Sequence, residues 1–180
     1  MTGATHAALG ALAGAAIARA SGTGDPLLAI AGAAGALLPD LDQPESRAWR
    51  YIVPYAAATI VLHHFAGIPV PRQLSTFSWL SLACLAAGLL THHRGLTHSL
   101  LALAGMAIGL AAGGTGTYGI AAWLGALSHI GADAITPEGV RLLWPLEKRY
   151  RLPLLRTGSS LDVAIGTTSA AAAALLLLRW

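Results

Sequence analysis

The chain has 180 residues, of which 55% are hydrophobic and 11% are charged, and its formal net charge is +3. This length predicts a single domain over residues 1–180, and a mean hydropathy of +0.62 argues against an ordinary soluble protein. The composition therefore predicts an all-α, polytopic membrane bundle of five to seven hydrophobic helices. A soluble alanine-rich bundle is the alternative, but residues 100–117 contain no charged side chain that could face water.

Several other functions and kinds of site lack support in the sequence. Basic residues do not form a face interleaved with aromatic side chains, so we expect no nucleic-acid partner. Cys84 is the only cysteine, which excludes intramolecular disulfides and thiolate zinc sites. The chain also lacks a glycine-rich phosphate loop and a Gly-x-Ser-x-Gly motif, so nucleotide hydrolysis and serine-esterase chemistry are not indicated.

Hydrophobic segments separated by glycine and proline clusters predict seven helices. In chain order, we expect them at residues 4–20, 27–38, 48–65, 77–90, 98–112, 118–133 and 161–179. A polar, proline-containing stretch over residues 136–160 precedes the last helix. The first two segments are shorter than the roughly 20 residues that cross a bilayer core. We therefore expect them to enter the membrane partway or to lie inside the bundle.

The scarce histidines and aspartates form four short clusters at the ends of these segments. The clusters are Thr5-His6, Pro39-Asp40-Leu41-Asp42, His92-His93-Arg94-Gly95-Leu96-Thr97-His98-Ser99, and Ser128-His129 with Asp133. Ionisable side chains are costly near lipid, so their concentration in such clusters favours a functional site. Imidazoles and carboxylates are also the ligands that zinc and manganese use in proteins.

Counting the helices places all four clusters, and Asp162, at one membrane face. Each successive pair of helices leaves that face and returns to it, so the polar site is expected there. The basic residues expected on the same face are Arg47, Arg50, Arg94, Arg141, Lys148, Arg149, Arg151 and Arg156; those expected on the opposite face are Arg19, Arg72 and Arg179. The positive-inside rule then predicts a multi-pass protein of the cytoplasmic (inner) membrane with its site face in the cytoplasm.

Two of the clusters have spacings that suit a metal ion. His129 and Asp133 are four residues apart, which places them on one face of a helix and lets both bind one ion. Asp40 and Asp42 follow a helix that ends at a proline, where the helix dipole already disfavours negative charge. A metal ion or an arginine would compensate these carboxylates; the alternative is a solvated loop in which an aspartate caps the next helix.

The third cluster combines two imidazoles with a guanidinium. Arg94 suits bidentate contact with a phosphate or carboxylate, Gly95 allows close backbone approach, and Thr97 is expected to cap the following helix. The spacing does not decide whether His92 or His93 belongs to the expected metal site. His63 and His64 lie toward the opposite end of their helix, so they are expected to be packing or interfacial residues.

The clusters supply more nitrogen and oxygen ligands than one four-coordinate ion needs. These candidate ligands are His6, Asp40, Asp42, His98, His129 and Asp133. A divalent ion, zinc or manganese, is therefore expected, and the number of ligands leaves room for a second ion bridged by a carboxylate. Such a site activates water as a nucleophile.

The ordered motifs resemble those of the YdjM-like family of bacterial and archaeal inner-membrane proteins. The matching segments are Thr5-His6, Leu37-Leu38-Pro39-Asp40-Leu41-Asp42, His93-Arg94-Gly95-Leu96-Thr97-His98-Ser99, Leu127-Ser128-His129-Ile130-Gly131-Ala132-Asp133, Thr136-Pro137-Glu138-Gly139-Val140, Leu143-Trp144-Pro145, Arg151-Leu152-Pro153 and Gly158-Ser159-Ser160-Leu161-Asp162. The resemblance implies a membrane-bound, metal-dependent hydrolase, regulated by LexA in some bacteria. It favours His93 over His92 as a ligand or general acid. It also adds Asp162, at a position where the family usually carries glutamate, as a ligand or acid–base group.

These observations lead to one hypothesis with two alternatives. We expect metal-activated water to cleave a phosphoester or related ester of a lipid or membrane-associated substrate. Arg94 would bind the substrate's anionic group, and Asp42 would bridge two ions or support a ligand. The alternatives are a metal-binding transporter and a non-catalytic membrane scaffold; a transporter typically places its charges at the bilayer midplane. The substrate and the oligomeric state are left open by the sequence.

Overall fold

The computed structural model describes residues 1–91 and 93–178, without the side chain of Arg47. The expectations for His92, for Arg179 and for the Arg47 side chain thus lie outside the described residues. Within them, the chain forms seven α-helices: α1 (Gly3–Ala20), α2 (Leu27–Leu37), α3 (Arg47–Ile60), α4 (Arg72–Leu90), α5 (Leu100–Ala112), α6 (Gly116–Ala134) and α7 (Ser160–Leu178). Three short helical turns join them: η1 (Pro39–Asp42), η2 (Val61–Phe65) and η3 (Leu96–His98). The predictions of an all-α fold and of seven helices are confirmed.

The starts of α4 and α5 differ from the expected ones for reasons that the structure shows. Helix α4 begins five residues earlier than expected, at Arg72, directly after Pro71, whose carbonyl accepts from the amides of Leu74 and Ser75. Helix α5 does not begin at His98. Ser99 rather than Thr97 caps it, since the Ser99 hydroxyl accepts from the amide of Ala102 at 3.2 Å, which frees Thr97 for another contact.

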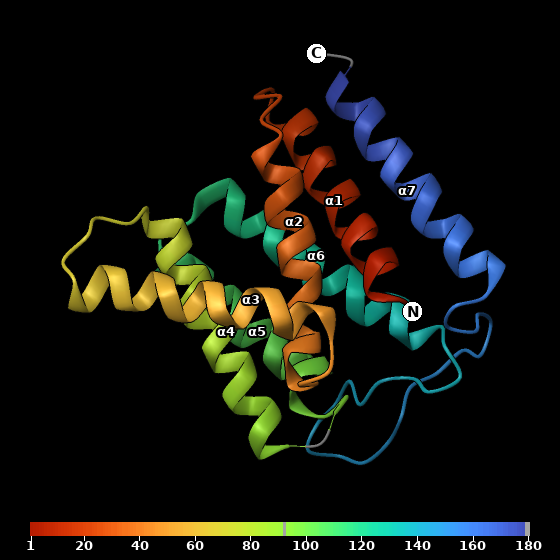
Figure 1. The fold of residues 1–180 in the computed structure, drawn as a ribbon. Coiled ribbons are helices and arrows are strands. Elements are labelled where there is room, and N and C mark those ends of the chain that lie inside the picture. The colour runs from red at the N-terminus through yellow and green to blue at the C-terminus, as the bar shows by residue number, and fades with distance from the viewer. Residues whose placement is uncertain (92, 179–180) are drawn as a thin grey trace.

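One part of the fold is a tightly packed group formed by α1, α2 and α6, with α7 lying along α1 (Figure 1). Glycines allow this close approach. A Cβ at Gly32 would collide with the carbonyl of Gly10, and a Cβ at Gly125 would collide with the carbonyl of Gly32. Small residues at helix crossings are typical of membrane helices, whose association depends on backbone proximity rather than on the hydrophobic effect.

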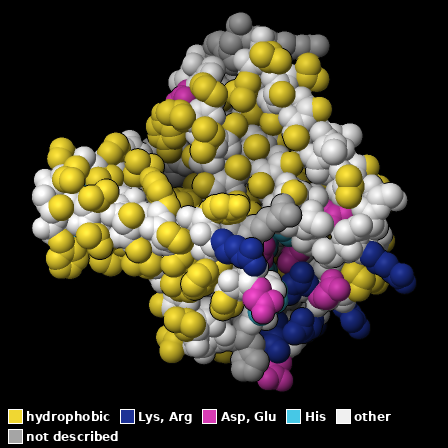
Figure 2. All heavy atoms as spheres, in the orientation of Figure 1, with side chains coloured by type: hydrophobic (Ala, Val, Ile, Leu, Met, Phe, Trp, Pro, Cys, Tyr) yellow, Lys and Arg dark blue, Asp and Glu magenta, His cyan; other side chains and the backbone are white. Residues whose placement is uncertain are grey.

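Helices α3 and α4 form an arm that extends away from this group (Figure 1). Hydrophobic side chains are spread over the face of the arm that Figure 2 shows. Phe65 is 82% exposed and Leu90 is 86% exposed, so large apolar side chains cover the arm from tip to base. A surface of this kind is stable in lipid and would promote aggregation in water.

Helices α4 and α7 are, within residues 1–91 and 93–178, the two helices that are long and apolar enough to cross a membrane. Each has 19 residues, which corresponds to roughly 28 Å of helix at 1.5 Å per residue. That length is close to the thickness of a bilayer core, roughly 30 Å. Helix α5 is also apolar but has 13 residues, too few to span the core alone.

Candidate metal centre

The polar clusters meet where α1 begins and α6 ends. His6 comes from the first turns of α1, Asp40 from η1, His98 from η3, and His129 and Asp133 from the last turns of α6. The three histidines and Asp133 are at most 1% exposed. Figure 2 shows the charged side chains gathered at this end of the molecule, with histidine between them.

Four potential ligand atoms converge in this centre. The Nε2 atoms of His98 and His129 lie 3.2 Å apart. Asp40 Oδ1 lies 3.9 Å from the first nitrogen and 3.5 Å from the second, and Asp133 Oδ2 lies 3.8 Å from each. Ligands at about 2.0–2.1 Å around a tetrahedral zinc ion are themselves roughly 3.3 Å apart. The spacing of these atoms therefore suits a shared divalent ion.

The hydrogen bonds of the two imidazoles also favour a cation between them. His129 Nδ1 lies 2.7 Å from the carbonyl oxygen of Ala36, which can only accept, so this nitrogen carries the proton. His98 Nδ1 lies 3.0 Å from the Thr97 hydroxyl, whose own proton goes to Asp42. In the neutral rings both Nε2 atoms are then lone-pair acceptors that face each other. Outer hydrogen bonds that fix the tautomer in this way are typical of metal-binding histidines.

Two groups of residues in the described chain have ligand atoms within 4.8 Å of one another: His6 with His129 and Asp133, and Asp40 with His98 and His129. The His6 ring stacks on the His129 ring at 3.7 Å, and its Nε2 lies 3.2 Å from Asp133 Oδ1. His6 Nδ1 is buried and has no hydrogen-bond partner among the described residues. His129 is a member of both groups.

Asp42 lies beside these groups but outside both of them, and it organises the loop before η3. Its carboxylate accepts from His93 Nδ1 at 2.7 Å, from the Arg94 amide at 3.2 Å and from the Thr97 hydroxyl at 2.5 Å. Burial raises the pKa of Asp42, but the hydrogen bond from His93 and the His98 ring, whose Nδ1 is 3.5 Å away, outweigh it and hold that pKa well below its usual range. Asp42 therefore stays ionised and positions this loop.

His93 and Asp40 are the more accessible members of the centre. The His93 side chain is 39% exposed, and its hydrogen bond to Asp42 raises its pKa despite partial burial. The Asp40 side chain is 18% exposed. Burial raises the pKa of Asp40, an effect that His98 and His6 partly oppose. A substrate could thus reach both residues from outside.

Arg94 lies directly against the candidate ligands. Its backbone adopts a left-handed conformation, with φ of 60°, which is strained for a side chain of this kind. Its Nη2 lies 2.9 Å from Asp133 Oδ2, and its Nη1 lies 3.7 Å from Glu138 Oε2 and 3.5 Å from the carbonyl of Gly139. The guanidinium thus adds positive charge beside one candidate ligand and is held there by the loop that follows α6.

Asp162 is buried but does not join either group. Its Oδ2 accepts from the amides of Thr2 at 3.0 Å and Gly158 at 2.8 Å, and the Thr5 hydroxyl donates to its carbonyl at 3.2 Å. Asp162 therefore attaches the start of α7 to the start of α1. Its Oδ1 is buried and without a partner among the residues described.

His63 and His64 are on η2 and have other contacts. His63 Nδ1 lies 3.2 Å from the carbonyl of Ile68, and His64 Nε2 accepts from the indole of Trp79 at 3.3 Å. These are packing contacts of the arm. They agree with the separate role expected for the two histidines.

Three groups that shape the centre were not identified in the sequence. They are the Thr97 hydroxyl, the Ala36 carbonyl and Gly88 of α4. A Cβ at Gly88 would collide with the Cα and Cβ of Asp42, so this glycine lets α4 pass close to η1. The position of Gly88 near the end of an apolar helix gave no signal, because the glycine's partner is more than forty residues away in the chain.

Replacing Gly88 with alanine is expected to displace Asp42 and, through it, the loop that carries His93 and His98. We expect metal affinity to fall by about 10- to 100-fold, the usual effect of losing an outer-shell contact. Competition with a chelating dye measures this. Gly105→Ala on α5 is the matched control, because nothing lies within 4 Å of the new methyl group. Equal affinities in the two variants would contradict the positioning role of Gly88.

Comparison with known proteins places the whole chain in one family. Residues 1–179 match the family described as YdjM inner membrane protein. The chain is 39% identical over 117 residues to the inner membrane protein YdjM of Escherichia coli (strain K12), a match that covers 59% of this chain and 56% of that protein. The same values hold for the inner membrane protein YdjM of Shigella flexneri.

The match thus spans little more than half the length of these relatives. No solved structure shows a significant match. The match to the family extends over nearly all of the sequence, from the first residue to the end of α7. The chain belongs to the YdjM inner membrane protein family.

Proposed function

We propose that this protein is a metal-dependent hydrolase that cleaves a phosphoester or related ester of a membrane lipid. The observation that carries the proposal is the pair of imidazole Nε2 atoms 3.2 Å apart, flanked by Asp40 and Asp133. Two unprotonated nitrogens repel each other at this distance unless a cation lies between them. Nitrogen and oxygen donors of this kind suit zinc or manganese.

We propose that one ion, rather than two, is held by His98, His129, Asp40 and Asp133. The two candidate groups share His129, and the Nδ1 of this ring is already bonded to the Ala36 carbonyl. One nitrogen lone pair binds one ion, so a second ion could not also use His129. In this assignment His6 orients Asp133 from its opposite oxygen, 3.2 Å away.

The residues around the ligands support hydrolysis. A divalent ion, when bound, supplies charge that lowers the pKa of water and stabilises an anionic transition state. Arg94 adds a fixed positive charge beside Asp133, where it can bind a phosphate oxygen. His93 is held by Asp42 through Nδ1, which leaves Nε2 to donate a proton to the leaving group.

The surroundings of the centre support a lipid substrate and a membrane orientation. The family is one of inner membrane proteins, and α4 and α7 have the length and composition of spans. The centre lies at the end of the molecule where the charged side chains gather (Figure 2), as an interfacial site requires. The basic residues of this end favour its location on the cytoplasmic side.

Metal analysis of the detergent-purified protein, followed by turnover of phosphoester lipids, tests the proposal. We expect one ion per chain and release of a water-soluble product that stops when a chelator removes the ion. Two ions per chain would contradict the single-ion assignment. Metal-dependent uptake into vesicles without any hydrolysis would instead support a transporter. Unfolding on metal removal, with no substrate turned over, would support a scaffold.

Replacing His93 with alanine is expected to lower kcat by about 10²- to 10⁴-fold, the usual contribution of a general acid or base. Metal content should stay unchanged, because His93 lies outside both groups of candidate ligands. His63→Ala is the control, since it removes an imidazole from the arm. Loss of metal from the His93 variant would show that His93 is a ligand instead.

A further inference from the structure

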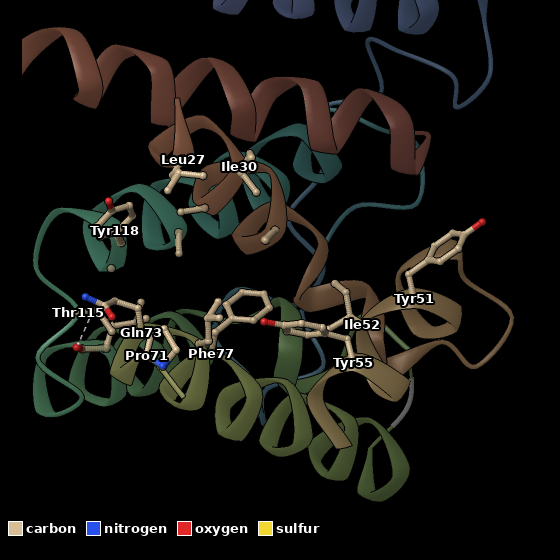
Figure 3. A pocket seen from close by; sticks show the side chains of 16 residues that line it. Leu27, Ile30, Tyr51, Ile52, Tyr55, Pro71, Gln73, Phe77, Thr115 and Tyr118 are labelled. Atoms are coloured by element: carbon tan, nitrogen blue, oxygen red, sulfur yellow. Dashed lines mark hydrogen bonds between the residues drawn. The ribbon is translucent and has the colours of Figure 1, made fainter. Parts of the chain in front are cut away.

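An apolar groove of about 720 Å³ runs between α2 and α6 on one side and the arm of α3 and α4 on the other. Its walls come from α2, α3, the start of α4 and the start of α6, and include Ile30, Ala34, Ile52, Leu74, Phe77 and Tyr118. Figure 3 shows its two ends, one marked by Tyr51 and the other by Thr115 and Tyr118. Its volume lies within the range of roughly 300–1,000 Å³ that is typical of ligand pockets.

The chemistry of the walls selects a hydrocarbon. None of the described lining residues is charged, and the hydroxyl of Tyr118 is already bonded to Asp25. The groove opens to the surface of the molecule, because Ile30 in its wall is 63% exposed and Leu74 is 42% exposed. In an inner membrane protein, an apolar groove open to the outside is accessible to the chains of bilayer lipids.

The course of the groove links it to the candidate metal centre. Helices α2 and α3, which line opposite sides, are joined by the segment that contains η1 and its two aspartates. The Ser46 hydroxyl at the start of α3 donates to the Asp40 carbonyl at 2.9 Å. Ile52, in the groove wall, packs on the core cluster that contains Leu38 and Leu41. The end of the groove at Tyr51 and Ile52 is therefore the end nearer to Asp40.

We propose that the groove binds one hydrocarbon chain of a membrane lipid whose phosphoester headgroup lies at the Asp40 end. The hydrocarbon chain then lies in the groove, and the polar headgroup contacts the positive charges of the centre, which are Arg94 and the proposed ion. The placement of the headgroup rests on the proposed hydrolase function. Binding of the hydrocarbon chain does not rest on that function, because it depends on the groove alone.

Photo-crosslinking tests the occupant directly. Benzoylphenylalanine is placed at Phe77, inside the groove, or at Ile108, which is 70% exposed on α5 outside it. Each protein is equilibrated with vesicles of phosphatidylglycerol and phosphatidylethanolamine, transferred to excess detergent and irradiated. We expect a lipid adduct at Phe77 that exceeds the adduct at Ile108 by about tenfold or more. Equal lipid adducts, or a crosslink between two protein chains at Phe77, would overturn the proposal.

A groove-filling variant provides a second test. Ala34→Trp, combined with the Phe77 probe, should abolish the lipid adduct while leaving metal content intact, and Ile108→Trp should leave the adduct unchanged. Retention of the adduct in the Ala34 variant would overturn the proposed location. An adduct without any lipid hydrolysis would support the groove and count against the hydrolase.

The orientation of the lipid is tested with a photoreactive group on the headgroup. Labelled peptides are identified by mass spectrometry. We expect labels within residues 39–52. Labels at Gln73 or Thr115 instead would overturn the orientation.

Discussion

Replacing His129 with alanine is expected to remove both the metal ion and the hydrolytic activity. His129 is the residue that the two candidate groups share, so its loss leaves neither group with three ligands and removes one of the four proposed ligands of the ion. Affinity should fall by more than about 100-fold, since loss of an outer-shell contact alone costs up to that factor. Metal content after dialysis against a weak chelator, and lipid turnover in the same sample, measure the two effects.

The His129 experiment needs a control for the loss of any imidazole. His64→Ala serves, because His64 contacts Trp79 on the arm. It should retain full metal content and turnover. A His129 variant that also retained its metal would show that the convergence of nitrogen and oxygen atoms does not bind the ion.

Replacing Gly125 with alanine is expected to destabilise the protein by about 1–3 kcal/mol, the range seen for overpacked cores. The new methyl group would collide with backbone atoms of Gly32 and Ala36, and backbone cannot move aside as a flexible side chain can. The same shift would disturb the Ala36 carbonyl that fixes His129. Thermal unfolding in detergent should therefore show a lowered Tm, together with weaker metal binding.

Gly131→Ala provides the matched comparison on the same helix. Nothing lies within 4 Å of a methyl group at this position, and alanine is favoured over glycine in a helix by up to about 1 kcal/mol. We expect an unchanged or raised Tm. Similar losses of stability in both variants would mean that the close contact between α2 and α6 does not explain the effect, because helix propensity favours alanine at both positions.

The sequence predicted the helices well because long apolar segments between glycine and proline clusters leave few alternatives. It also identified His6, Asp40, His98, His129 and Asp133 as candidate ligands, since ionisable residues are rare in such a chain. The structure brings these side chains together. Their roles as ligands stay predictions that metal analysis will test.

The parts that could not be predicted depend on contacts between distant segments. Hydrophobic patterning does not reveal that Ala36 accepts from His129, because every residue carries the same carbonyl group. It equally gives no reason for Thr97 to donate to Asp42 rather than cap α5. Gly32 and Gly125 are visible as small residues, but only the folded chain shows which backbone each one meets.

The four atoms that converge on the proposed ion belong to η1, η3 and α6, which are far apart in the chain. An ion bound there acts as a crosslink, and ligands that bind only the folded state raise its stability in proportion to the logarithm of their concentration. The lifetime of the protein in the cell would then depend on the supply of free metal. Starvation for that metal would lower its abundance by degradation, even where its synthesis is unchanged.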